Sequence, residues 1–343
     1  MGRGSADVDV LAARVALVPE GVPLPPSGEV PGADVLRGAG DWLFEGATPN
    51  RASAQVSGDV RLSERALGRW QFALEARKAW LRKAGAEYVC LIAPATHAVH
   101  PEFLPPTMVL SHERPVKQLL EHLAAERSPV CPLYPLREFH ESEWATHTSH
   151  DSRWNAHGAF VAYRLVMEEV AARHDVRVLD RDDMGFAWRE ALGDLGYRVH
   201  PEVRRLSLVG RPWPQSGWLA EDNCVAGEGR RLVTRCSWVP DTTCVVLGDW
   251  SAYQMLVPLG DSFRRMVFAH VTTLDHELVE QERPDVVISV LDEARLTDVP
   301  VDIEAPSAAH MAAAKIHAGR RPMPTLAPLW NQTEPAGDFS SSA

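Results

Sequence analysis

The sequence predicts an α/β protein with a mostly parallel sheet and helices on both faces, on the basis of three observations. Amphipathic helical patterns alternate with short apolar runs between residues 63 and 291. The apolar runs are continuous, which is typical of strands buried on both faces. Residues 181–240, rich in Trp, Arg and Gly, break this alternation, so we expect an irregular or antiparallel insertion there.

Each element has its own signal. The first helix, 63–84, opens at Ser63, a good N-cap, places Trp70 and Leu74 near one face, and ends before Gly85. In chain order, the remaining elements are expected as strands at 87–94, 130–133, 176–179, 242–247, 267–271 and 285–291, and as helices at 115–126, 156–173, 252–259 and 276–283.

The two ends of the 343-residue chain lack this alternation. Residues 20–36 are rich in Pro and Gly, so 1–37 is expected to be an extended lead-in. The α/β domain should cover 38–302. The segment 303–343 should be a mostly irregular tail with one short helix at 308–314.

Composition excludes several classes of protein. Lys and Arg number 35 against 46 Asp and Glu, and the net charge of −11 disfavours binding to nucleic acid or to an anionic membrane surface. No stretch approaches the roughly 20 apolar residues of a spanning helix, and no secretory signal is evident, so we expect a cytoplasmic protein. The five cysteines include no C-x-x-C pair. We expect no metal and no cofactor, because His147, His150 and His157 lack metal-binding spacing.

Candidate functional residues lie where predicted strands pass into helices. Ligands of open α/β sheets bind at the carboxyl ends of the strands, where helix N-termini present N–H donors. Three such junctions carry unusual residues: 94–100 (PATHAVH), 149–158 (SHDSRWNAHG) and 248–253 (GDWSAY).

Five motifs together resemble the alginate O-acetyltransferase-like branch of the SGNH hydrolases. They are G-D-W-L-F at 40–44, A-P-x-x-H-x-V-x-P-E-x-L-P at 93–105, D-S-x-W-N-x-x-G-A at 151–159, G-D-x-S-A-Y at 248–253 and P-D-V-V-I at 284–288. The resemblance spans roughly residues 38–300 and implies an SGNH-like α/β fold. It also implies acyl transfer, in which a Ser attacks an ester, a His takes its proton and an Asp orients the His.

The sequence departs from this triad at two positions. The family's Gly-Asp-Ser is here Gly248-Asp249-Trp250, and an indole cannot attack an ester. The family's Asp-x-His ends here in Arg153, whose pKa above about 12 prevents it from acting as a base at neutral pH. Only Asp151 keeps the residue that the resemblance implies, and we expect it to pair with Arg153.

The interpretation we favour is a noncanonical enzyme that tailors a small molecule of the natural-product type. Arg153 and helix N-terminal N–H groups would hold an anionic group of the substrate or a departing anion, without a serine nucleophile. A carboxylate such as Asp151, Asp249 or Asp41 would act as the base in ring closure, elimination or group transfer. The expected substrate-binding residues are Trp250, Thr96, His97 and Asn155. Thr96 stands where the family often has a lysine.

Two alternatives stay open. Ser251 could serve as a displaced nucleophile of an O-acyltransferase or esterase, with His97, His150 or His157 as its base, although an N-cap role is commoner for such a serine. The chain could also be a non-catalytic subunit that acts with a protein partner. The intact-looking Gly-Asp-Ser-Phe at 260–263 is expected at the far end of the helix after the nucleophile turn, away from the site.

Overall fold

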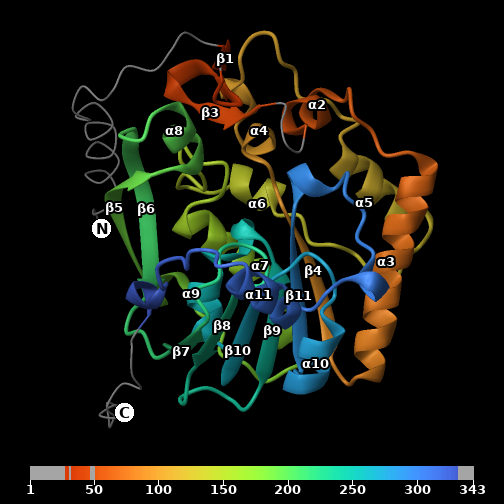
Figure 1. The fold of residues 1–343 in the computed structure, drawn as a ribbon. Helices are drawn as coiled ribbons and strands as arrows, with labels where there is room; N and C mark the ends of the chain where they lie inside the picture. The colour runs from red at the N-terminus through yellow and green to blue at the C-terminus, as the bar shows by residue number, and fades with distance from the viewer. Residues whose placement is uncertain (1–27, 31, 47–50, 331–343) are drawn as a thin grey trace, which may run out of the picture.

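The computed structural model describes residues 28–30, 32–46 and 51–330, so most of the predicted lead-in lies outside the described residues. Its centre is a six-stranded sheet in the order β4-β11-β9-β10-β8-β7 (Figure 1). The strands β4 (Glu87–Ala93), β11 (Val286–Asp292), β9 (Thr243–Gly248) and β10 (Arg265–His270) are parallel. The strands β8 (Arg231–Arg235) and β7 (Trp218–Asp222) continue the sheet in antiparallel register. The predicted mostly parallel α/β architecture is confirmed.

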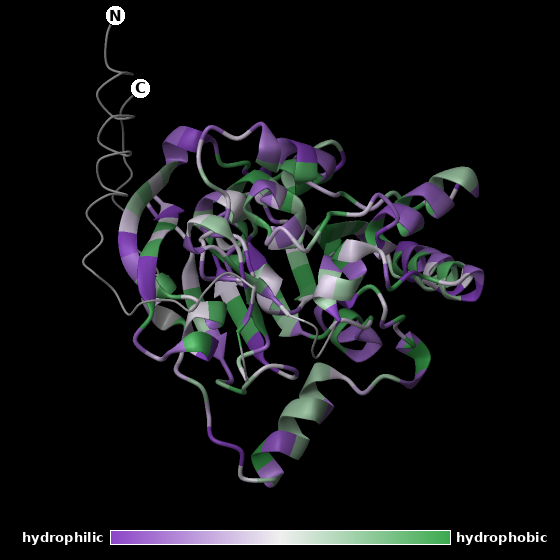
Figure 2. Ribbon diagram, turned by 90° about the horizontal axis from the view of Figure 1, so that it is seen from above, coloured by the Kyte–Doolittle hydropathy of each residue, from purple (hydrophilic) through white to green (hydrophobic). Residues whose placement is uncertain are grey.

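Helices cover both faces of this sheet. One face packs under α3 (Glu64–Lys83), α5 (Pro115–Ala125) and α10 (His276–Glu282), and the other under α7 (Ala156–Ala171) and α9 (Leu256–Gly260). Val245 and Val287 are buried in the first core, whereas their neighbours Val246 and Ile288 are buried in the second. Successive strand residues therefore both need apolar side chains, and Figure 2 shows hydrophobic strands between helices of mixed hydropathy.

The predicted insertion is antiparallel. The long strands β5 (Met184–Leu192) and β6 (Arg204–Pro212) pair as a two-stranded ribbon, and α8 (Asp194–Val199) joins them. A three-stranded antiparallel sheet of β1 (Gly28–Val30), β2 (Val35–Arg37) and β3 (Leu43–Glu45) packs beside α8. The remaining α-helices are α2 (Ala52–Ser57), α4 (Thr96–Val99), α6 (Leu136–His140) and α11 (Ala308–His317).

Three predicted elements differ in the structure. Segment 130–133 forms only one isolated bridge, Leu133 with Leu91, because Pro132 has no N–H to donate to a ladder. Segment 176–179 forms no strand, since the Leu179 N–H donates instead to the Tyr163 hydroxyl, at 2.8 Å. The helix expected at 252–259 begins only at Leu256, after the 3-10 turn η4 (Trp250–Ala252).

The C-terminal segment is partly packed. The short helix expected at 308–314 is α11 and runs on to His317. Trp330 lies in the same core as α7 and α9. Among the described residues, no helix has the length and apolarity needed to cross a bilayer.

Candidate active site

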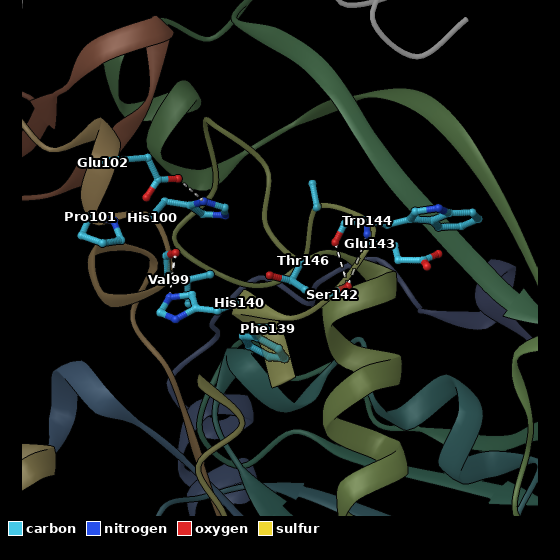
Figure 3. Close-up of a pocket in the computed structure, with 11 residues that line it drawn as sticks. Val99, His100, Pro101, Glu102, Phe139, His140, Ser142, Glu143, Trp144 and Thr146 are labelled. Atoms are coloured by element: carbon cyan, nitrogen blue, oxygen red, sulfur yellow. Dashed lines mark hydrogen bonds and ion pairs between the residues drawn. The ribbon is translucent and has the colours of Figure 1, made fainter. Parts of the chain in front are cut away.

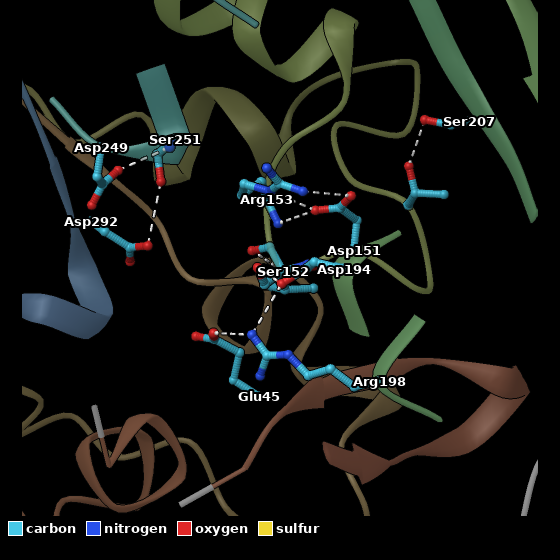
Figure 4. A network of polar contacts seen from close by, with 12 residues as sticks. Glu45, Asp151, Ser152, Arg153, Asp194, Arg198, Ser207, Asp249, Ser251 and Asp292 are labelled. Carbon is cyan, nitrogen blue, oxygen red and sulfur yellow. Dashed lines mark hydrogen bonds and ion pairs between the residues drawn. The ribbon is translucent and has the colours of Figure 1, made fainter. Parts of the chain in front are cut away.

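Two carboxyl groups meet at the carboxyl edge of the sheet. Asp249 directly follows β9 and Asp292 ends β11, and these strands are parallel neighbours, with Val290 opposite Gly248. Asp249 caps η4 by accepting a hydrogen bond from the Ser251 N–H at 2.9 Å. Asp292 accepts one from the Ser251 hydroxyl, with Oγ and Oδ2 at 3.3 Å (Figure 4). The two acids therefore flank Ser251.

The environment of this pair favours protons. Burial raises the pKa of Asp249. Burial, followed by the nearby charges of Asp249 and Glu45, raises the pKa of Asp292 well above its usual range. The second oxygen of Asp249, Oδ2, is buried without a hydrogen bond, and its nearest ion-pair partner is Arg295 Nη1 at 3.9 Å. Since like charges oppose joint ionisation, the pair can hold one proton and offer both an acid and a base.

Arg153 lies beside this pair and is already neutralised. Its Nε donates to Asp151 Oδ1 at 2.9 Å and its Nη2 to Asp151 Oδ2 at 3.2 Å, so the expected ion pair is present. The charge of Asp194 also stabilises the protonated guanidinium, and that of Arg153 lowers the pKa of Asp249. Arg153 therefore lies within electrostatic range of the turn that carries Trp250, but it is not a free cation.

Two further elements bring acidic groups to the same place. The α8 helix begins with Asp194, whose carboxylate accepts hydrogen bonds from the Ser152 N–H and hydroxyl at 2.8 and 2.9 Å. A Cβ on Gly193 would lie 2.0 Å from the His150 carbonyl oxygen, so a glycine lets α8 approach this loop. Glu45 ends β3, where burial first and the charge of Asp194 second raise its pKa to about 7.

The cluster as a whole is acidic. Its carboxylates outnumber its guanidinium groups, and Arg198 bridges two of them, Asp194 at 3.3 Å and Glu45 at 3.7 Å. The carboxylates are Glu45, Asp151, Asp194, Asp249 and Asp292, and the cations are Arg153, Arg198 and Arg295. We therefore revise the expectation of an anion site at Arg153, because the surrounding field does not favour an added negative charge.

The other predicted binding residues fall into two groups. Thr96 begins α4 and its hydroxyl donates to the Ser152 carbonyl at 2.9 Å, so it borders the cluster. Trp250 is 37% exposed and stacks on Tyr253, with ring centroids 4.8 Å apart, and its ring edge meets His270. Trp250 therefore packs along the neighbouring aromatic surface.

His97 and Asn155 hold the local backbone instead. His97 Nε2 donates to the Glu45 carbonyl at 3.1 Å, and burial lowers its pKa to about 4, so it is neutral. The Asn155 side chain caps α7 by accepting from the N–H groups of 157 and 158, and it donates to the carbonyl of Ala145 at 2.7 Å. The polar groups of both side chains bond to the backbone of the loops around the cluster.

The predicted serine and histidine partners do not meet. Ser251 is 4% exposed, and its hydroxyl contacts Asp292. His150 bonds to the Ala191 carbonyl and His157 to the Ser142 hydroxyl. In the part of the chain that the structure describes, no three His, Cys, Asp or Glu side chains are placed to hold a metal ion.

The second Gly-Asp-Ser motif lies inside the core, as its position after the helix predicts. Ser262 is fully buried at the end of α9, and its hydroxyl bonds to the Tyr163 hydroxyl at 2.7 Å and donates to the Pro258 carbonyl at 3.1 Å. A serine enclosed in this way has no approach for a substrate.

Sequence analysis missed three of the five carboxylates of the cluster, and also Arg198 and Arg295. The rule that ligands bind at the carboxyl ends of parallel strands could have found Asp292, which follows the predicted strand 285–291. Glu45 and Asp194 carried no such signal, because β3 and α8 reach the cluster only through tertiary packing.

Comparison with known proteins agrees with this fold. The family model described as "SGNH hydrolase-like domain, acetyltransferase AlgX" matches residues 35–202. Bacillus cereus PatB1, solved with a sulfonyl adduct, is 14% identical with a TM-score of 0.57, covering 76% of this chain and 94% of its own. The O-acetyltransferase domain of Pseudomonas putida AlgJ is 16% identical with a TM-score of 0.52, covering 83% and 99%.

A DHHW family protein from Eubacterium siraeum DSM 15702 also shares the fold, with 10% identity, a TM-score of 0.53, and coverage of 81% of this chain and 97% of its own. No curated protein sequence is significantly similar to this chain. These structural likenesses show the fold alone, and the family model adds the type of domain. Residues 35–202 of this chain are therefore similar to the SGNH hydrolase-like domain described for the acetyltransferase AlgX.

Proposed function

We propose that this protein is an SGNH-like enzyme that tailors a small molecule through the carboxyl pair Asp249 and Asp292, without a serine nucleophile. The family's chemistry is of the acyl-transfer and hydrolase type, so a small-molecule substrate with a departing oxygen is expected. The observation that carries the proposal is the raised pKa of both acids, held side by side at the carboxyl edge of the sheet.

The residues at the family's Ser and His positions support a mechanism without a triad. Trp250 follows Asp249 at the place of the nucleophile, and an indole forms no acyl intermediate. Arg153 stands at the place of the base and is held by Asp151. A reaction at this edge therefore needs its acid and base from other side chains, and Asp249 and Asp292 are next to the turn.

The pair can divide the work of a group transfer. The protonated member donates its proton to the departing oxygen of the substrate. The ionised member accepts a proton from the attacking amine, hydroxyl or water. Attack within one molecule gives ring closure, attack by a second molecule gives group transfer, and removal of a C–H proton gives elimination. Because a carboxylic acid neutralises the departing oxygen, this mechanism does not require Arg153 to bind an anion.

An activated ester tests the proposal. Release of nitrophenolate from 4-nitrophenyl acetate is measured for the wild type, Asp249→Asn and Asp292→Asn. We expect each substitution to lower kcat by about 100-fold or more, in line with the loss of general acid-base catalysis. Asp241→Asn is the matched control, because Asp241 is exposed and precedes β9 at the opposite end of the strand. Wild-type rates no higher than those of both variants would refute the proposal.

One contact favours a second candidate, an acyltransferase or esterase that uses Ser251. Its hydroxyl lies 3.3 Å from Asp292, which could take its proton in place of a histidine. Intact-mass measurement after incubation with the same ester separates the two candidates. An acetyl adduct that Ser251→Ala abolishes supports the serine mechanism, whereas turnover without an adduct supports the carboxyl pair.

A further inference from the structure

A second feature of the molecule lies outside the carboxylate cluster. A cavity of about 470 Å³ opens where α4 ends and α6 meets the loop that leads to α7 (Figure 3). This volume falls within the range of small-molecule sites, about 300 to 1,000 Å³. The residues lining it are Val99, His100, Pro101, Glu102, Phe139, His140, Ser142, Glu143, Trp144, Ala145 and Thr146.

The walls combine apolar surface with a fixed aromatic side chain. Val99 and Phe139 are buried and give the cavity an apolar floor. Trp144 is held in place, because the Arg181 guanidinium lies 4.2 Å from its ring centroid and the His157 ring 5.4 Å away. A rigid aromatic wall suits a ligand with an apolar or ring-shaped body.

Two imidazole groups, those of His100 and His140, border this space. Burial lowers the pKa of His100, so the ring is neutral near pH 7. His100 Nδ1 lies 3.2 Å from Glu102 Oε1 and must donate to it, which leaves the lone pair on Nε2. That Nε2 atom is buried and has no hydrogen-bond partner. His140 Nε2 donates to the carbonyls of 98 and 99 at 3.2 and 3.1 Å.

The charged groups of the lining have one sign. Glu102 and Glu143 are both exposed at the cavity, and no Lys or Arg belongs to its lining. The one cation stacked on Trp144, Arg181, is not a lining residue. A ligand that fits this lining should carry positive charge, because an anion would meet carboxylates without a compensating Lys or Arg in the lining.

We propose that this cavity binds a small molecule that carries a protonated amine beside an apolar or ring-shaped body. The ammonium group would lie near Glu102 and Glu143, while the body packs on Phe139 and Trp144. This inference concerns binding at a separate site and does not depend on the reaction proposed for Asp249 and Asp292.

Three probes with the same ring test the proposal. Benzylammonium, benzyl alcohol and benzoate are titrated into the full chain, and their dissociation constants are measured by saturation-transfer NMR. We expect benzylammonium to bind about 5-fold more tightly than benzyl alcohol, the size of effect that partly exposed carboxylates give, and benzoate not to saturate. Benzoate binding as tightly as benzylammonium, or no saturable binding of benzylammonium, would overturn the proposal.

Variants locate the binding. The double substitution Glu102→Gln with Glu143→Gln should bring the affinity for benzylammonium close to that for benzyl alcohol. Glu141→Gln is the matched control, since Glu141 is exposed on the same segment but does not line the cavity, and it should change nothing. Ala145→Phe places a ring at an exposed lining position and should block the ammonium probe. Unchanged benzylammonium binding in both the double variant and Ala145→Phe, with unchanged melting temperatures, would place the probe elsewhere and refute the site.

Discussion

Replacement of Glu45 by Gln should make the protein more stable at neutral and alkaline pH. Burial and the charge of Asp194 raise the pKa of Glu45 from its ordinary value of 4.5 to about 7. A carboxyl whose pKa is higher in the folded state favours folding while protonated, so stability is full below about 4.5 and falls as the pH rises toward 7. At about 1.4 kcal/mol for each pH unit, the span from 4.5 to about 7 corresponds to roughly 3 kcal/mol.

Glutamine resembles the protonated carboxyl and cannot ionise, so this loss should disappear in Glu45→Gln. Urea unfolding at pH 5, 6, 7 and 8 gives the free energy of unfolding of both proteins. Between pH 5 and pH 8, the free energy of unfolding of the variant should rise relative to that of the wild type by up to about 3 kcal/mol. Arg198, 3.7 Å from Glu45, stabilises the ionised carboxylate and makes this difference smaller. A difference between the two proteins that does not change with pH, or that turns against the variant as the pH rises, would refute this account of the cluster.

Three further substitutions test buried contacts other than those of the carboxyl pair. Ser262→Ala leaves the buried Tyr163 hydroxyl with one partner fewer and should cost about 1 to 2 kcal/mol of unfolding free energy. The variant should release nitrophenolate as fast as the wild type, and a slower release would make Ser262 part of the site. Glu293→Ala leaves Arg114 buried and unpaired and should cost about 3 to 5 kcal/mol in urea unfolding, so a cost under 1 kcal/mol would mean that the pair is solvated. Trp330→Ala empties part of the main core and should cost about 3 to 5 kcal/mol, and a melting temperature equal to that of the wild type would show that the C-terminal segment does not pack there.

The sheet could be predicted because burial on both faces leaves a direct mark on the sequence. Val245 and Val246 point into opposite cores, so the run 242–247 is apolar at consecutive positions. Segments 130–133 and 176–179 carry a similar apolar pattern without becoming strands. Their side chains pack, but backbone pairing depends on Pro132 and on the Tyr163 hydroxyl, and apolar periodicity does not report on either.

The site could be predicted only where it follows from sheet topology. Asp249 and Ser251 lie at the end of a parallel strand, and the same rule reaches Asp292. Glu45 comes from β3, which is tied to the loop before Asp151 by a hydrogen bond from the Leu43 N–H to the Ser149 carbonyl at 2.7 Å. A contact between segments a hundred residues apart has no local signature, so the acidic character of the cluster became visible only in three dimensions.

Trp250 and Arg153 affect the cluster differently. The Trp250 ring packs against Tyr253 and the edge of His270, so the turn after β9 presents Asp249 and Ser251 to Asp292. Burial raises the pKa of both acids. The charge of Arg153 opposes this rise at Asp249, whereas the charges of Asp249 and Glu45 add to it at Asp292. Two acids that interact this closely ionise in two steps that belong to the pair. In the mechanism that we propose, the pair therefore supplies both the proton donor and the proton acceptor, at the edge of the sheet where Trp250 and Arg153 lie.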